Sequence, residues 1–266
     1  MRKWGGLIII FLLSFMCSPA QAQLLIEQGK IQPNIIAGET QRGTVAVHNT
    51  SDKTIEVRAY WEDFEYVEPF DGKKKFMPPG TSPYSAYDWV SFSPREFTLP
   101  PFGKIDLTYI LNVPRTAKGG RYGVLFVEQA LGNMPNKTGV KIVARVGALF
   151  FLETKKVRYS KVEDIKSDGA DLNGVFINAG NLFLTPEAVY YFLDAQGMVA
   201  ARGKVDKFYI SPEQQKRFSI SIPQDLSPGT YSCVLTFDLG EGHSIVKEIA
   251  FSRNTDSSVT LLTKPQ

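Results

Sequence analysis

The sequence predicts an all-β protein with two tandem immunoglobulin-like β-sandwich domains that follow a cleaved signal peptide. Apolar and polar residues alternate with a period of two along many short segments, which is typical of strands that bury one face. Residues that favour turns separate these segments, and no segment keeps the 3.6-residue period of an amphipathic helix. At 266 residues, the chain is long enough for two domains that each bury a core.

The composition narrows the possible classes of function. The chain carries 30 Lys and Arg against 27 Asp and Glu, so it lacks the basic excess expected of a nucleic-acid-binding protein. It contains two histidines and two cysteines, which leaves few ligands for a soft metal ion. No Gly-x-Ser-x-Gly nucleophile motif occurs in the sequence. We therefore expect no enzyme, no metal site and no cofactor.

Residues 1–22 have the organisation of a cleaved signal peptide. Two basic residues precede the apolar run LIIIFLLSFM, and an Ala-x-Ala cleavage site ends at Ala22. Such a run would rise only about 15 Å as a helix, which is too short to cross a bilayer. Cleavage would also remove Cys17, so that Cys233 is the remaining cysteine and no intrachain disulfide can form. We expect a chain without a membrane span after cleavage, located in the periplasm or alternatively secreted or held at the cell surface.

A weak internal repeat organises the rest of the chain. Gly120-Arg121-Tyr122 follows an alternating strand and a turn in the first copy, and Gly229-Thr230-Tyr231 does so in the second. We expect each tyrosine ring to pack between two sheets while its hydroxyl binds a backbone group. The first copy is longer, because it carries an insert at residues 66–93. The expected domains are residues 23–153 and 158–252, followed by a polar tail at 253–266.

The insert at residues 66–93 combines aromatic residues with a run of three lysines and the sequence Pro78-Pro79-Gly80. Aromatic side chains on loops with basic neighbours can stack on a sugar or hold a peptide. The alternative is a long hairpin that wraps the sandwich and packs its aromatic residues beneath it. The candidate contact residues are Phe76, Tyr84, Tyr87 and Trp89.

The order of strands and turns in the first domain resembles a known family. The segments that carry the resemblance are Ile31-Gln32-Pro33, Val45–Asn49, Trp89–Pro101 and Gly120–Phe126. Together they are similar to the N-terminal domain of the PapD-like periplasmic chaperones of pilus assembly. Modules of WxL-associated bacterial surface proteins share this pattern, and the second domain resembles the second module of those proteins at least as well.

The resemblance to the chaperones implies a function in the assembly of pilin-like or other surface protein subunits. Such a chaperone lends an edge strand with alternating apolar residues to a subunit whose sandwich lacks one strand. Here the donated strand would be Val140–Phe151, which we expect to be a sheet edge with an exposed apolar row. The alternative is an ordinary last strand. Val140, Ile142, Ala144 and Val146 would share one face, and Lys141, Val143 and Arg145 the other.

The family also anchors the terminal carboxylate of its client with two basic residues. Lys30 falls at the first of these positions. Ala148 occupies the second, and Arg145 lies three residues earlier as the possible substitute. The predicted partner-binding residues are thus Lys30, Val140, Ile142, Ala144, Arg145 and Val146.

A second interpretation is a cell-envelope scaffold or carbohydrate-binding accessory protein that uses the aromatic insert. A cleft near Lys30 and Arg145 would favour the chaperone, whereas an elongated rod would favour the scaffold. The sequence itself indicates no oligomeric state.

Overall fold

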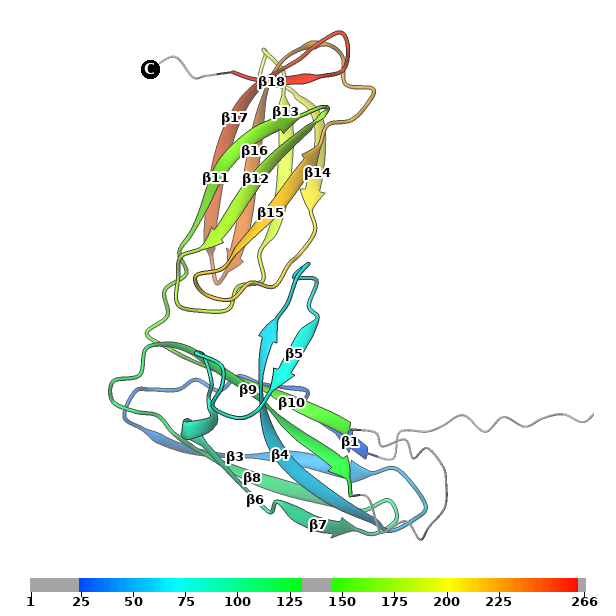
Figure 1. Ribbon diagram of the computed structural model, residues 1–266, viewed down its shortest axis with the longest axis vertical. Helices are drawn as coiled ribbons and strands as arrows, with labels where there is room; N and C mark the ends of the chain where they lie inside the picture. The colour runs from blue at the N-terminus through cyan, green and yellow to red at the C-terminus, as the bar shows by residue number, and fades with distance from the viewer. Residues whose placement is uncertain (1–23, 131–144, 263–266) are drawn as a thin grey trace, which may run out of the picture.

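The computed structural model describes residues 24–130 and 145–262, which form two β-sandwiches that meet at an angle (Figure 1). The predicted all-β architecture of two immunoglobulin-like sandwiches is confirmed. The expected signal peptide lies outside the described residues. Within the described residues, no helix is long and apolar enough to span a bilayer.

The first sandwich packs a sheet of order β1-β3-β8-β6 against a sheet of order β2-β10-β9-β4-β5, in which β7 also pairs with β4. Its strands are β1 (Leu24–Ile26), β2 (Lys30–Ile31), β3 (Thr40–Asn49), β4 (Ile55–Tyr66), β5 (Lys74–Met77), β6 (Val90–Ser93), β7 (Glu96–Leu99), β8 (Lys104–Asn112), β9 (Gly119–Gln129) and β10 (Arg145–Thr154). A single 3-10 turn, η1 (Tyr87–Trp89), precedes β6. We call this sandwich domain one.

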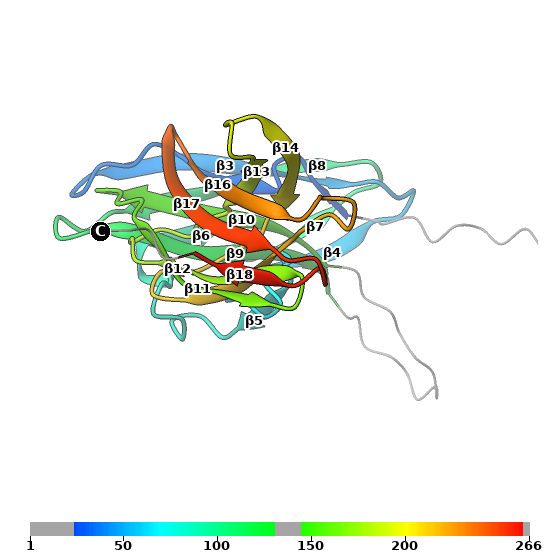
Figure 2. The same ribbon diagram turned by 90° about the horizontal axis from the view of Figure 1, so that it is seen from above.

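The second sandwich, domain two, packs a sheet of order β11-β12-β15 against one of order β14-β13-β16-β17-β18. Figure 2 shows β11 and β12 in one layer and β13, β16 and β17 in the other. The strands are β11 (Ser160–Asp168), β12 (Asp171–Asn178), β13 (Glu187–Leu193), β14 (Val199–Val205), β15 (Gln215–Ser221), β16 (Gly229–Gly240), β17 (His243–Arg253) and β18 (Val259–Leu261). β18 lies within the segment expected to be a polar tail and pairs with β17.

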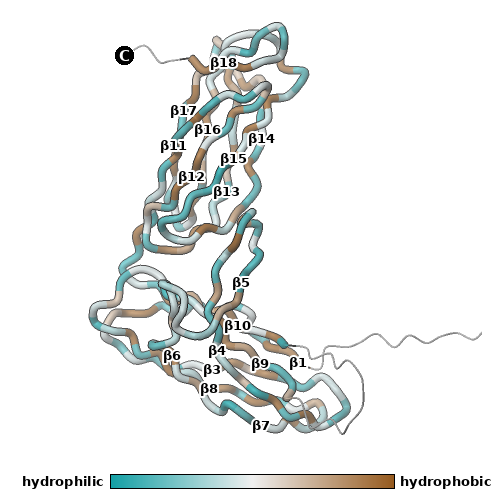
Figure 3. The backbone as a smooth tube through the Cα atoms, in the orientation of Figure 1, coloured by the Kyte–Doolittle hydropathy of each residue, from teal (hydrophilic) through white to brown (hydrophobic). Residues whose placement is uncertain are grey.

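The period-two alternation places side chains on the two faces of each strand as the sequence predicts. In β4, Val57, Ala59 and Trp61 are buried in the core of domain one, whereas Tyr60 and Glu62 point the other way. Hydrophobic positions recur between hydrophilic ones along strands of both domains (Figure 3). In β16, Cys233 is a fully buried free thiol, and burial raises its pKa to about 12.

The two Gly-x-Tyr sequences do not play the same part. Tyr231 packs in the core of domain two, and its hydroxyl donates to the backbone oxygen of Ser227 at 2.9 Å, as predicted. Tyr122 is also buried, but it points away from the core of domain one and contacts domain two. The expectation that both rings pack between the sheets of their own domain was wrong for Tyr122, because β9 presents Leu125 and Val127 to the core and therefore Tyr122 to the opposite face.

A buried carboxylate fixes part of the insert against β4. Asp63 has no exposed surface, and its carboxylate accepts hydrogen bonds from the amide of Ser82 at 3.0 Å and the hydroxyl of Ser85 at 2.7 Å. The segment held in this way pairs with β9, where the amide of Tyr122 donates to the oxygen of Tyr84 at 2.7 Å. Asp63 thereby orders the part of the insert that lies beside Tyr122.

Replacement of Asp63 by alanine should lower the free energy of unfolding by about 2 to 3 kcal/mol, because buried donors lose a charged acceptor. Asp63→Asn should cost less, since it keeps one acceptor oxygen, and the exposed Asp52→Ala should have no measurable effect. Denaturant unfolding of the three variants measures the differences. Equal midpoints for Asp63→Ala and the wild type would contradict this role.

Candidate partner-binding face

Three predicted partner-binding residues lie within the described part of the chain: Lys30 and Arg145 share one face of domain one, whereas Val146 packs toward its core. This outer face is the side of the β2-β10-β9-β4-β5 sheet that turns away from the core of domain one. The strand registers bring Tyr60 beside Phe126 and place Glu62 beside Val124. The side chains that define the outer face are Lys30, Tyr60, Glu62, Phe76, Phe126, Arg145, Leu149 and Phe151.

Arg145, at the start of β10, is held by four neighbours on the outer face. Its guanidinium donates to the hydroxyl of Tyr60 and to the carboxylate of Glu62, each at 3.1 Å. It also lies 4.0 Å from the ring centre of Phe126 and 5.3 Å from that of Phe76. Burial raises the pKa of Tyr60, so its hydroxyl stays protonated at neutral pH. The contacts orient Arg145 and leave 38% of its side chain exposed.

Lys30 lies on the neighbouring strand in a different environment. β2 pairs in parallel with β10, and Lys30 is opposite Leu149. The ammonium group is 4.7 Å from the ring centre of Phe151, and within the described residues it makes no ion pair. Lys30 is therefore an exposed cation supported by an aromatic ring.

The structure separates the two cations that the resemblance would pair. Lys30 and Arg145 share the outer face, but Arg145 is four residues from Leu149, which corresponds to about 13 Å along the strand. Ala148, at the expected basic position, is fully buried on the core side. The outer-face residues of β10 next to Lys30 are Leu149 and Phe151, so no second cation from β10 lies beside it.

The first part of β10 is a sheet edge that β1 approaches without pairing with it. β10 pairs with β9 from Arg145 to Thr154, but it pairs with β2 only at Leu149 and Phe150. No described strand pairs with Arg145–Ala148 on the side away from β9. The expected exposed apolar row is not found in this part, because Ala148 is fully buried and Val146 packs half-buried against the core. Val140, Ile142 and Ala144 lie outside the described residues.

The four aromatic residues proposed as sugar or peptide contacts do not form one surface. Phe76 is on β5, where 37% of it is exposed and its ring centre is 5.0 Å from that of Phe126. Tyr84 donates to the oxygen of Pro212 in domain two at 3.1 Å. Trp89 is buried in the core of domain one, whereas Tyr87 on the same 3-10 turn is 38% exposed. The hairpin alternative describes the insert better, since β5 extends the sheet beside β4.

The loop of the β4–β5 hairpin contacts domain two, as Figure 1 shows. The amide of Tyr209 donates to the oxygen of Phe70 at 2.8 Å, and the ring of Tyr209 stacks on Tyr66 with centres 4.9 Å apart. The ammonium of Lys216 donates to the oxygen of Pro69. This contact was not predicted from the sequence. The sequence signal for it was the run of large aromatic residues in and around the loop, from Tyr66 through Phe70 to Phe76.

A second contact between the domains is centred on Tyr122. Its ring stacks on Phe183 of domain two with centres 3.8 Å apart and planes 5° apart. Its hydroxyl accepts a hydrogen bond from the amide of Phe183 at 2.8 Å and is 3.4 Å from the buried carboxylate of Glu153. Burial raises the pKa of Tyr122 well above its ordinary range, so the hydroxyl remains neutral. Nearby, the amide of Gly120 donates to the oxygen of Asn181 at 2.9 Å.

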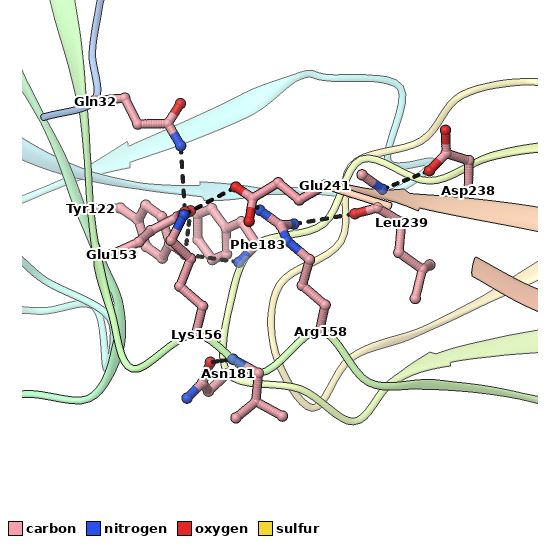
Figure 4. A network of polar contacts seen from close by, with 12 residues as sticks. Gln32, Tyr122, Glu153, Lys156, Arg158, Asn181, Phe183, Asp238, Leu239 and Glu241 are labelled. Atoms are coloured by element: carbon pink, nitrogen blue, oxygen red, sulfur yellow. Dashed lines mark hydrogen bonds and ion pairs between the residues drawn. The ribbon is translucent and has the colours of Figure 1, made fainter. Parts of the chain in front are cut away.

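A third contact joins the segment between the domains to domain two (Figure 4). Lys156 and Arg158, between β10 and β11, each bind the carboxylate of Glu241 at 3.0 Å. Arg158 also donates to the oxygen of Leu239 at 3.2 Å. Hydrogen bonds from Arg158 and Lys156 lower the pKa of Glu241 to about 2.

Comparison with solved structures identifies the fold. A chain from a chaperone–tip adhesin complex of CFA/I fimbriae has a TM-score of 0.53 at 14% identity, and the match covers 85% of this chain and 98% of that chain. The class 5 fimbriae chaperone CfaA gives a TM-score of 0.53 at 13% identity with the same coverage. The chain therefore has the PapD-like two-domain fold of fimbrial chaperones, as the resemblance predicted. No protein-family model and no curated protein sequence matches it.

The ion pairs of Glu241 should make a small pH-dependent contribution to stability. Because the folded pKa is about 2 and the ordinary value is 4.5, the stabilisation is present above about pH 4.5 and disappears as the pH falls toward 2. The difference in unfolding midpoint between wild type and Glu241→Gln should therefore be largest near pH 7 and shrink toward pH 3. Asp206→Asn, at a side chain that is 92% exposed, is the matched control and should show no such trend. A difference that grows on acidification would contradict this assignment.

Proposed function

We propose that this protein is a non-enzymatic periplasmic chaperone for pilin-like or other surface protein subunits. Its client would receive β10 and the segment before it as a missing strand. The observation that carries this proposal concerns the two sides of β10. On one side, Arg145–Ala148 have no described partner strand, whereas on the other side β10 pairs with β9 along its whole length. An unpaired row of backbone amides and carbonyls is a template for a strand from another chain.

The side-chain pattern supports the same proposal. Val146 and Ala148 face the core of domain one, so this row of β10 is apolar. By the period-two alternation of the sequence, Val140, Ile142 and Ala144 belong to the same row. A strand that continued from β10 with this row would offer apolar side chains to an incomplete core in a client subunit.

The outer face beside this edge supplies charge for client recognition. Lys30 has no acidic partner among the described residues, and an approaching carboxylate would meet its ammonium above Phe151. Arg145 is already neutralised by Glu62, so we assign it to the orientation of the β10 edge and Lys30 to the contact with a client carboxylate. This division of roles differs from the paired cations of the family that the sequence resembles.

The solved structures support the class of partner. One similar chain comes from a complex of a chaperone with a tip adhesin, and another is a fimbriae chaperone. The signal-peptide pattern of residues 1–22 supports export, and we place the mature chain in the periplasm.

The substitution Ile142→Asp should abolish client binding, because it puts a charge into the donated apolar row. Val143→Asp is the matched control, since it makes the same chemical change on the opposite face of the same segment and should retain binding. The measurement is capture of subunits from an envelope extract by the tagged mature protein, with mass spectrometry of what is recovered. Equal recovery of pilin-like subunits by both variants, or recovery of none by the wild type, would contradict strand donation.

A further inference from the structure

In the five-stranded sheet of domain two, strand β13 exposes apolar side chains on a face that is usually polar when it meets solvent. β13 has the sequence EAVYYFL, and its residues Ala188, Tyr190 and Phe192 are buried in the core. The alternate residues Val189 and Tyr191 point outward and are 48% and 39% exposed. An antiparallel sheet with one face in water normally carries polar residues there, so β13 departs from that pattern.

The registers extend this apolar surface over two further strands. Val189 is opposite Thr236 of β16, which is opposite Val246 of β17, a residue that is 60% exposed. Tyr191 is opposite Val234 of β16, which is half-buried. We call these residues the domain-two patch. Its four apolar side chains lie on three adjacent strands beside Thr236, and it contains no residue of domain one. Lys204 of β14 is opposite Val189 and borders the patch with an exposed ammonium group.

Charged residues of opposite sign lie at the two ends of one row of the patch. Arg202 of β14 is opposite Tyr191, and Glu248 of β17 is opposite Val234. Across the four strands the row therefore reads Arg202, Tyr191, Val234, Glu248. Both end residues are exposed, and Glu248 accepts a hydrogen bond from the hydroxyl of Ser232 at 3.0 Å within its own sheet.

We propose that the domain-two patch binds a second copy of this chain. Two patches would lie face to face if a two-fold axis ran between the two facing sheets, parallel to the strands and level with the gap between β13 and β16. Because the axis reverses the row, Arg202 would lie opposite Glu248 of the second copy, and Tyr191 would lie opposite Val234 of the second copy. The Tyr191 row is thus complementary to itself in both charge and apolar character, which is what an isologous interface requires. In the neighbouring row, Lys204 would lie opposite Val246 of the second copy, so the charge pairs belong to the Tyr191 row alone.

The size of the patch sets the strength of this contact. The four strands of the row, about 4.8 Å apart, and a strand length of seven residues at about 3.4 Å each set an upper limit of roughly 450 Å² per copy. Stable interfaces bury about 800 Å² per partner, so this dimer is a weak one. It forms at micromolar or higher concentration and leaves the β10 edge of each copy unoccupied, because that edge belongs to domain one.

Sedimentation velocity of the mature protein alone, from about 5 to 500 μM, tests the dimer. We expect a monomer–dimer equilibrium that Arg202→Glu and Glu248→Arg each weaken by at least about tenfold, because each places like charges opposite one another twice per dimer. An equal mixture of the two variants should dimerise more strongly than either alone. In the mixed dimer, both charged contacts again join residues of opposite sign.

Two further variants separate the patch from general surface effects. Tyr191→Lys should abolish the dimer, whereas Tyr159→Lys, at an aromatic residue that is 52% exposed outside the patch, should leave it unchanged. Circular dichroism and the unfolding midpoint establish that each variant is folded. The proposal is overturned if the wild type remains monomeric up to about 500 μM, or if the charge variants mixed together associate no better than either alone. No client is present, so the result is independent of the strand-donation test.

Discussion

The arrangement of this molecule depends on the contact between Tyr122 and Phe183. Stacked rings at 3.8 Å and a hydrogen bond from the amide of Phe183 to the tyrosine hydroxyl join two domains whose sheets share no strand. The contact is buried, and it makes the hydrophobic cluster of domain two continuous with the outer face of domain one. An aromatic pair of this kind adds directional stabilisation to the burial of its surface, so it orients the domains as well as joining them. The hairpin loop near Phe70 and the ion pairs of Glu241 support the same orientation from two other places.

This orientation explains the position of the candidate binding face. β9 carries both Tyr122, at the junction, and Phe126, beside Arg145, on one side of the sheet. The face that joins the domains is therefore the same face that continues along β10 to its open edge. A client strand added at Arg145–Ala148 would lie next to a surface that the junction holds in place. The contacts between the domains lie at one end of the face and the edge proposed to receive a client lies at the other.

The aromatic insert shows that one composition is compatible with two different environments of its rings. Its rings were expected to bind a ligand or to pack beneath a hairpin, and the second of these describes most of them. Tyr84 and Phe70 contact domain two, Trp89 is in the core, and Phe76 covers Phe126. Exposure could not be deduced from the sequence, because a ring on a loop is solvated or buried according to what lies beside the loop. In this protein the neighbour is a second domain more than a hundred residues away along the chain.

The sequence by itself determined the strands, the two sandwiches and the buried state of residues such as Cys233, because period-two alternation is a local property that the chain carries wherever it folds. It also predicted the last strand of domain one, of which the part from Arg145 onward lies in β10. Only the tertiary structure decided that Tyr122 faces domain two and that Ala148 faces the core. It likewise decided that Arg145 binds Tyr60 and Glu62, which are 85 and 83 residues away. These outcomes depend on which strands become neighbours and in what register, and long-range pairing of this kind leaves no trace in the local pattern of residues.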